Sequence, residues 1–134
     1  NMAQLIPRHS QEVYANFELY ESLKASMDPL YTQVKDLIST HFPDEYKSLC
    51  KYTDSLPMTE PAPAPPFAGL VYNLNVATEL HRDWNDDGIC VVVVISDCTG
   101  GELILVELGL VIELKNGDAI VFRSGDITHL NAHF

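Results

Sequence analysis

The segment KNGDAIVF, residues 115–122, places an Asn-Gly pair directly before a short apolar run. Asn-Gly is the strongest short-range signal for a β-hairpin turn, because both residues tolerate a positive φ at low cost. The preceding residues, 110–114, form a second apolar run. The segment therefore predicts a turn between two strands and indicates a β structure for this half of the chain.

Further strand signals extend in both directions from this turn. The segment ICVVVVIS, residues 89–96, is β-branched and apolar on both faces, so we predict a central strand that is covered on both sides. Gly100-Gly101 and Leu108-Gly109 separate the neighbouring runs, as expected of turns. The full set of predicted strands is 69–75, 78–82, 89–96, 102–107, 110–114, 119–123 and 127 to the end.

The first third of the chain has the spacing of helices instead. Asp28-Pro29 predicts the start of a second helix, with Asp as N-cap and Pro at the first helical position, and Pro43 predicts a third. Ser10 is the predicted N-cap of the first. In this first helix, which begins after Ser10, apolar residues recur near the helical period at Val13, Phe17, Tyr20 and Leu23.

A proline-rich segment, PMTEPAPAPP at residues 57–66, separates the two halves. Its prolines exclude both a helix and a central strand, so we expect an extended connector. The chain is thus predicted to form one compact domain with a helical N-terminal part (1–56), this connector, and a β core (67–134). Helices followed by many short strands indicate the α+β class, with a sandwich or barrel.

The charge is strongly acidic and unevenly distributed. The chain has 19 acidic and 8 basic residues, a net charge of −11, and residues 52–134 alone carry 12 acids against 3 bases. Such a surface repels phosphate backbones, which disfavours a nucleic acid as partner. No apolar run reaches membrane-spanning length and no signal-peptide pattern is present, so we expect no membrane partner.

The cysteines are Cys50, Cys90 and Cys98, an odd number without a C-x-x-C pair. This pattern argues against a disulfide framework and against a thiolate zinc site. We expect reduced, buried cysteines in an intracellular protein of the cytoplasm or nucleus. Because the sequence starts at Asn1 and stops at Phe134 within a strand-like run, we also expect it to be part of a longer protein.

The segment ELHRDWND, residues 79–86, contains the candidate site. In a strand, His81 and Asp83 point to the same side and can converge on one ion. His129, in the last strand-like run, is the candidate third ligand. Two histidines and one carboxylate on one face of a metal suit non-haem Fe(II), because the opposite positions stay open. On its own, the triplet is also compatible with a polar turn in which Asp83 accepts backbone hydrogen bonds.

Ordered motifs around the triplet favour the metal site. They are Leu70-Val-Tyr72-Asn, the H-x-D of His81-Arg82-Asp83, the apolar run 89–96, Gly100-Gly101-Glu102-Leu103, the G-D-x-x-x-F of 117–122, and His129. In order and spacing they resemble the Fe(II)- and 2-oxoglutarate-dependent dioxygenase superfamily over about residues 70–134. The segment HRDWNDDG with the G-G-E strand is most similar to a fungal group related to the dioxygenases that oxidise methylated pyrimidines in nucleic acids.

The resemblance implies a fold, a reaction and a ligand set. The fold would be a double-stranded β-helix (jelly-roll) core with the N-terminal helices packed on it, truncated at its C-terminus. His81, Asp83 and His129 would hold Fe(II), and 2-oxoglutarate would chelate it. A C–H bond of an unidentified substrate would be hydroxylated while 2-oxoglutarate is decarboxylated to succinate. In several relatives a tyrosine before the first histidine contacts the cosubstrate, and Tyr72 occupies that position.

One departure from the family keeps two alternatives open. The family normally has an Arg or Lys after the distal histidine, which pairs with the far carboxylate of 2-oxoglutarate. The sequence ends at Phe134 before this position, and Arg123 precedes His129, so it does not match. The alternatives are a non-catalytic β-helix fragment that acts as an interaction or structural module, and a cupin-like metalloprotein that does not use 2-oxoglutarate.

Residues next to the triplet have simpler expected roles. Arg82 should point away from the metal and form a salt bridge. Trp84 is expected either to stack on a substrate ring or to pack against the protein. The remaining histidines, His9, His41 and His133, lack acidic partners at ligand spacing and are not expected to be ligands.

Overall fold

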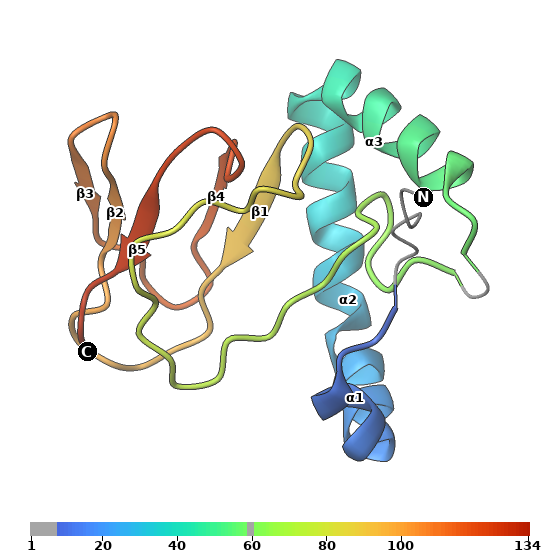
Figure 1. The fold of residues 1–134 in the computed structure, drawn as a ribbon, viewed down its shortest axis with the longest axis horizontal. Helices are drawn as coiled ribbons and strands as arrows, with labels where there is room; N and C mark the ends of the chain where they lie inside the picture. The colour runs from blue at the N-terminus through green and yellow to red at the C-terminus, as the bar shows by residue number, and fades with distance from the viewer. Residues whose placement is uncertain (1–7, 59–60) are drawn as a thin grey trace, which may run out of the picture. The chain divides into compact units, whose positions relative to one another are not determined.

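The structure is a computed structural model that describes residues 8–58 and 61–134. Residues 1–7 of the predicted helical part and residues 59–60 of the predicted connector lie outside the described residues. The chain divides into two compact units, Asn1–Tyr72 and Asn73–Phe134. In the first unit, α1 (Gln11–Ala15), α2 (Phe17–His41) and α3 (Pro43–Ser55) follow one another along the chain (Figure 1).

The helix starts predicted at Ser10 and Pro43 are confirmed, but two other boundaries differ: the first predicted helix is broken at Asn16 between α1 and α2, and no new helix starts at Pro29. The Ser10 hydroxyl accepts a hydrogen bond from the backbone N–H of Val13, as expected of an N-cap. α2 continues through Pro29, so the predicted second start at Asp28-Pro29 is wrong. A proline removes one backbone donor but does not end a helix whose apolar stripe continues, and this stripe leads to the buried Ile38. None of the described helices is long and apolar enough to cross a membrane.

The described part of the proline-rich connector folds back against α3. The Thr53 hydroxyl of α3 donates to the carbonyl of Pro66 at 2.7 Å, and Pro66 is buried. Ala64 and Phe67 form an isolated antiparallel bridge. The connector is therefore an ordered, non-helical segment of the first unit where the structure describes it.

The second unit contains two antiparallel sheets (Figure 1). β1 (Cys90–Val93) pairs with β4 (Ala119–Phe122), with Cys90 opposite Phe122. β2 (Leu103–Leu105) lies between β3 (Leu110–Ile112) and β5 (His129–Asn131). The predicted α+β class is confirmed in this form, as helices with antiparallel sheets.

Three predicted strands differ from the structure. Residues 69–75 form no strand, and 78–82 contains only the bridge residue His81. Leu74 and Leu80 are exposed, so these apolar residues are not held in a ladder by burial. β1 pairs only with β4 among the described strands, so the run 89–96 is an edge strand rather than a central one. An apolar run specifies burial, and its number of hydrogen-bonded neighbours is set by the rest of the chain.

The Asn116-Gly117 turn forms, but it does not close a hairpin. The N–H of Asp118 donates to the carbonyl of Lys115 at 2.9 Å, and Gly117 has a φ of 85°. The strands before and after it, β3 and β4, belong to different sheets. The turn residues bond instead to Val94, just beyond β1, through two backbone hydrogen bonds of 2.8 and 3.0 Å. The turn therefore carries the chain from one sheet to the other.

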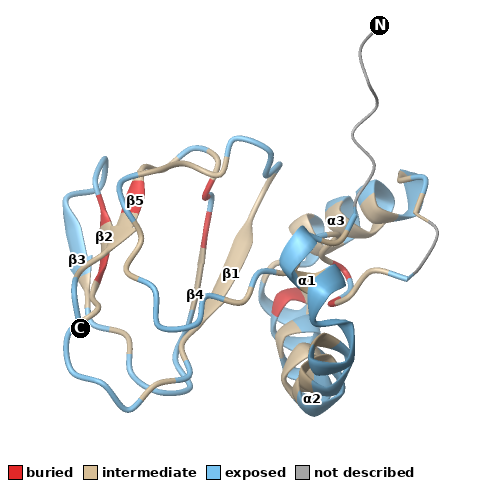
Figure 2. Cartoon of the chain, turned by 60° about the horizontal axis from the view of Figure 1, so that its bottom comes forward, coloured by how far each residue is buried: buried red, intermediate tan, exposed pale blue. Residues whose placement is uncertain are grey.

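The two sheets share one core. Leu103 and Leu105 of β2 pack with Phe122 of β4, and all three are buried (Figure 2). Partly buried apolar residues surround this cluster: Cys90, Val92, Ile112, Leu114, Ile120 and Ile127. The described strands do not close into a barrel, so the jelly-roll core expected from the resemblance remains a prediction.

Candidate metal centre

His81 and His129 form an antiparallel backbone pair. The N–H of His81 donates to the carbonyl of His129 at 3.1 Å, and the N–H of His129 donates to that of His81 at 2.9 Å. Residues directly opposite each other in an antiparallel pair project their side chains to the same side. The two imidazoles accordingly lie together, with ring centroids 4.3 Å apart.

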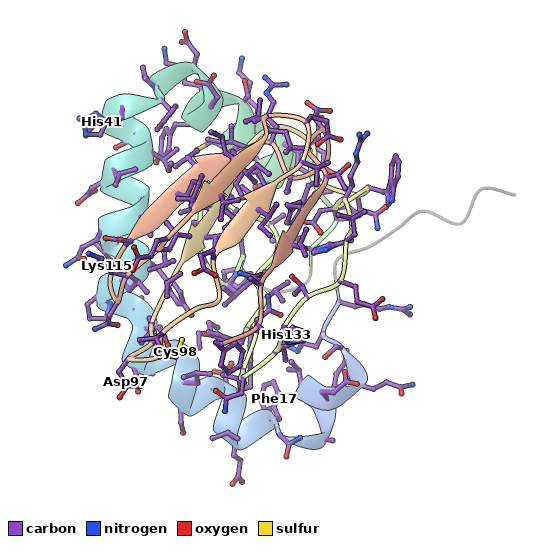
Figure 3. The ribbon with its side chains drawn as sticks, turned by 90° about the vertical axis from the view of Figure 1, so that its left-hand side faces the viewer. Phe17, His41, Asp97, Cys98, Lys115 and His133 are labelled. Carbon is purple, nitrogen blue, oxygen red and sulfur yellow. The ribbon has the colours of Figure 1, made fainter. Side chains whose placement is uncertain are left out.

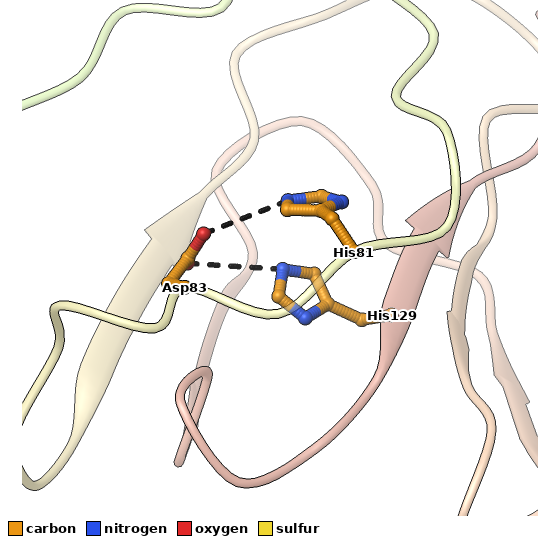
Figure 4. Close-up of side chains that lie close together, drawn as sticks. All are labelled: His81, Asp83 and His129. Atoms are coloured by element: carbon orange, nitrogen blue, oxygen red, sulfur yellow. Dashed lines mark ion pairs between the residues drawn. The ribbon is translucent and has the colours of Figure 1, made fainter.

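Asp83 completes the group from the same segment as His81 (Figure 4). Its carboxylate oxygens lie 3.6 Å from Nε2 of His81 and 3.9 Å from Nε2 of His129. The three candidate ligand atoms all lie within 4.8 Å of one another. In the described part of the chain, no other group of three His, Cys, Asp or Glu residues has this geometry. The structure thus brings together the three residues that the sequence indicated.

Backbone carbonyls fix which ring nitrogen faces the carboxylate. Nδ1 of His81 lies 2.7 Å from the carbonyl of Glu79, and Nδ1 of His129 lies 2.9 Å from that of Ile127. A carbonyl can only accept, so each Nδ1 carries the proton and each neutral ring keeps a lone pair on Nε2. Both lone pairs are directed toward Asp83. A hydrogen bond from the other ring nitrogen, here Nδ1, to a carbonyl is what commonly orients a metal-binding histidine.

This donor set fits a metal cation. Separations of 3.6 and 3.9 Å are too long for hydrogen bonds, so the carboxylate faces two lone pairs without a bond to either ring. A cation between them would make that arrangement favourable. Two atoms each about 2.1 Å from one ion stand about 3.0 Å apart in octahedral and about 3.4 Å apart in tetrahedral geometry. Side-chain shifts of under about 1 Å would therefore place all three atoms in a coordination sphere.

The family model Tet_JBP, described as the oxygenase domain of the 2OGFeDO superfamily, matches residues 1–134, the whole chain. The chain belongs to this family. The match extends the resemblance from about residues 70–134 to the N-terminal helices as well. Neither a curated protein nor a solved structure matches the chain. The superfamily uses Fe(II) and 2-oxoglutarate, and the His81, Asp83 and His129 group of this oxygenase domain is of the kind that binds such a metal.

Burial differs among the three candidate ligands. His129 is buried and packs edge-on against Phe122, with ring centroids 5.1 Å apart at 82°. The side chains of His81 and Asp83 are 39% and 41% exposed. One candidate ligand is thus anchored to the core of the oxygenase domain, while the side chains of the other two are partly exposed to solvent.

Ser124 and Gly125 support the turn that carries Asp83. The N–H of Asp83 donates to the carbonyl of the fully buried Ser124 at 3.1 Å. The Ser124 hydroxyl donates to the carboxylate of Asp86 at 2.8 Å, and the N–H of Asp86 donates to the carbonyl of Asp83. A Cβ on Gly125 would stand 2.6 Å from the carbonyl oxygen of Asp86, so only glycine permits this approach.

A network of Arg82, Glu107 and Thr128 lies beside the centre. Arg82 forms the predicted salt bridge, and its partner is Glu107. Glu107 also accepts hydrogen bonds from the hydroxyl and the backbone N–H of Thr128. The Thr128 hydroxyl hydrogen bond is the largest cause that lowers the pKa of Glu107 from 4.5 to about 2, and the Arg82 guanidinium also lowers it. Sequence patterns did not identify Glu107 or Thr128, because they are distant from Arg82 along the chain.

Tyr72, the predicted cosubstrate contact, belongs to the first unit. Its hydroxyl forms a short hydrogen bond with the hydroxyl of Tyr31 on α2. Burial, followed by this hydrogen bond, raises the pKa of Tyr31. The structure therefore shows how the Tyr72 side chain is held within its own unit, and its contact with 2-oxoglutarate stays a prediction.

Other residues near the motif have the simple environments expected of them. The Trp84 side chain is 79% exposed, with the Arg82 guanidinium 5.7 Å from its ring centroid, so packing into the core is excluded. His41 at the end of α2 and His133 near the C-terminus are exposed (Figure 3). Neither belongs to the metal-binding group.

Proposed function

We propose that this chain is an Fe(II)- and 2-oxoglutarate-dependent oxygenase that hydroxylates a C–H bond of its substrate, with decarboxylation of 2-oxoglutarate to succinate. One observation carries the proposal: His81 and His129 direct their Nε2 lone pairs toward the Asp83 carboxylate. The membership of the chain in an oxygenase family supports the same reaction class.

His81, Asp83 and His129 would hold the metal. Fe(II) bound by three groups on one side supplies open positions at which 2-oxoglutarate and oxygen can react. The carbonyls of Glu79 and Ile127 keep the two Nδ1 protons in place, so the histidines bind through Nε2 without losing a proton. Asp83 contributes the negative charge that favours a divalent ion over a neutral ligand.

Each ligand also has a steric role. The edge-on contact with Phe122 prevents the His129 ring from turning away from Asp83. The exposed sides of His81 and Asp83 leave the approach to the open positions free for cosubstrate and substrate. Tyr72 is proposed to contact 2-oxoglutarate through its hydroxyl, as a tyrosine at this position does in several relatives.

The substrate and compartment are proposed only in outline. The acidic balance of residues 52–134 disfavours contacts between this stretch and a phosphate backbone, so a nucleic-acid base would require basic surface from elsewhere. Cys50 and Cys90 are half-buried and Cys98 is exposed, so the predicted burial of the cysteines is wrong. An intracellular compartment is proposed from the odd number of cysteines and the lack of a C-x-x-C pair.

The decisive experiment is anaerobic addition of Fe(II) and then 2-oxoglutarate to the purified protein. We expect a visible charge-transfer band that requires both additions and is absent from His81→Ala. Admission of oxygen should then produce succinate in amounts that depend on the metal. His41→Ala, which changes a histidine outside the centre, serves as the matched control and should retain the band.

Two results would contradict the proposal in different ways. Metal binding without a band on addition of 2-oxoglutarate would favour the cupin-like metalloprotein. No metal binding by the unchanged protein would favour a non-catalytic module.

A further inference from the structure

The pairing between the two histidine-bearing segments is short. His81 and His129 form an isolated bridge rather than part of a longer ladder. Beyond it, the N–H of Asp83 bonds to Ser124 rather than to the residue that would continue the register. On the Thr78 side of the bridge, the N–H of Asn131 donates to the Thr78 hydroxyl at 3.0 Å, and that hydroxyl donates to the Asn131 side chain at 2.9 Å. On the Asp83 side these bonds give no support, and a twist of the segments there would separate the imidazoles.

Arg82 and Thr128 occupy the next opposed position of the same pair. Because His81 lies opposite His129, the antiparallel register places Arg82 opposite Thr128. Alternation along an extended segment turns these two side chains to the face opposite the metal ligands. They therefore connect the two segments from behind, where they do not compete for the metal.

Glu107 closes this connection into a ring of hydrogen bonds. The Arg82 Nε donates to the Thr128 hydroxyl at 2.8 Å, and that hydroxyl donates to Glu107 Oε1 at 2.5 Å. The Arg82 Nη2 pairs with the same carboxylate oxygen, and the Thr128 N–H donates to Oε2 at 2.7 Å. Every bond has a fixed donor and acceptor, so the ring is compatible with one arrangement of the three side chains.

The ring is attached to the core sheet by the backbone. Glu107 is the second residue after the end of β2, and the N–H of the intervening Val106 donates to the carbonyl of Thr128 at 2.9 Å. β2 carries the buried Leu103 and Leu105, so Glu107 is attached to a rigid part of the unit. The Arg82 and Glu107 side chains are 33% and 38% exposed, and ion pairs at such sites contribute little to global stability.

We propose that Arg82, Glu107 and Thr128 are positioning residues for the metal centre: their hydrogen-bonded ring fixes the register of the His81 and His129 segments and so the separation of the two imidazoles. The inference rests on the proposed metal site. It assigns the ring a role in metal affinity and coordination geometry rather than in folding.

Thr128→Val is the sharpest test, because it removes the hydroxyl with little change in shape and none in charge. With Co(II) as the probe, we expect about a 10-fold loss of affinity, as is typical when groups behind metal ligands are removed. The visible absorption bands of bound Co(II) should also change in position or intensity. Thr128→Ser keeps the hydroxyl and should restore both. The unfolding midpoint of the metal-free protein should change little.

Glu107→Gln provides a second variant should Thr128→Val fail to fold, and it should weaken Co(II) binding and alter the bands as well. Asp126→Asn is the charge-matched control, since it removes one carboxylate from an exposed pair with Arg123. Unchanged affinity and bands in both ring variants would overturn the positioning role while leaving the metal site intact. Equal losses in Glu107→Gln and Asp126→Asn would assign the effect to net charge and also overturn it. Absence of Co(II) binding by the unchanged protein would overturn the metal site itself.

Discussion

Nε2 of His129 and the carboxylate of Asp83 lie 3.9 Å apart although the residues are far apart in sequence, and no hydrogen bond joins them. The separation is held by backbone contacts on each side. His129 pairs with His81, and Asp83 is bonded to Ser124. The gap between the two groups is therefore a property of the folded unit rather than of two free side chains.

Asp83→Asn should abolish tight metal binding while preserving the fold. The amide has the shape of the carboxylate but lacks its charge, and it is a poor ligand for a divalent ion. The loss of affinity should exceed the roughly 10–100-fold seen for groups behind the ligands. Equilibrium dialysis with metal analysis measures it. His133→Ala is the control, and comparable losses in both variants would contradict the assignment.

Gly125→Ala should destabilise the protein and displace Asp83. The new Cβ would meet the carbonyl oxygens of Asp86 at 2.6 Å and Asp83 at 3.3 Å, so the turn must move. Overpacking of this kind costs about 1–3 kcal/mol of unfolding free energy. Denaturant unfolding measures the cost. Gly69→Ala is the matched control because no atom lies within 4 Å of its Cβ; similar costs at the two positions would refute the steric account.

Phe122→Ala should be among the most destabilising substitutions in the second unit. Phe122 is buried between the two sheets and also contacts His129. Truncation of a buried phenylalanine costs about 3–5 kcal/mol. Val111→Ala, at a side chain that is 67% exposed, should cost less than about 0.5 kcal/mol. Chemical denaturation measures the loss of unfolding free energy in each variant. Equal losses for Phe122→Ala and Val111→Ala would contradict a core position for Phe122.

Glu107 should make only a small contribution to stability at neutral pH, because its side chain is partly exposed, and that contribution should be lost in acid. Its pKa falls from 4.5 to about 2 on folding, so the unfolded chain takes up the proton first as the pH falls. The contribution is present above pH 4.5 and disappears as the pH falls toward 2. The unfolding free energies of the unchanged protein and of Glu107→Gln should therefore converge across this range. Thr128→Val removes the hydrogen bond that lowers the Glu107 pKa most, so the pH interval over which the stabilisation is lost should become narrower. An unchanged interval would show that this hydrogen bond does not cause the lowered pKa.

Local rules predicted part of the site. The side-by-side placement of His81 and Asp83 follows from the period of an extended segment, and the structure has it. His129 was identified by its place in the family's motif order, because no local pattern links it to His81. The salt bridge of Arg82 could be predicted from its orientation. Its partner Glu107 could not, since that contact depends on the packing of β2 against β5.

The sheets show a similar limit. The Asn116-Gly117 pair predicted a turn, and a turn is present. The pairing of its flanking strands was wrong because the turn's backbone groups bond to Val94 instead of closing a hairpin. A helix cap depends on neighbouring residues alone, and the cap at Ser10 was predicted correctly. Asp28-Pro29 was predicted to start a new helix, but α2 continues through Pro29 because its apolar stripe continues to the buried Ile38.

The distance in sequence between His81 and His129 has a consequence for heat stability. An ion bound by both histidines would link two segments that are far apart in the sequence, and it would do so only in the folded state. Because the unfolded chain cannot present the three groups together, an ion at 100 times its dissociation constant should add about 2.7 kcal/mol. The second unit should therefore melt at a temperature that rises with metal concentration, and chelation should reverse the rise.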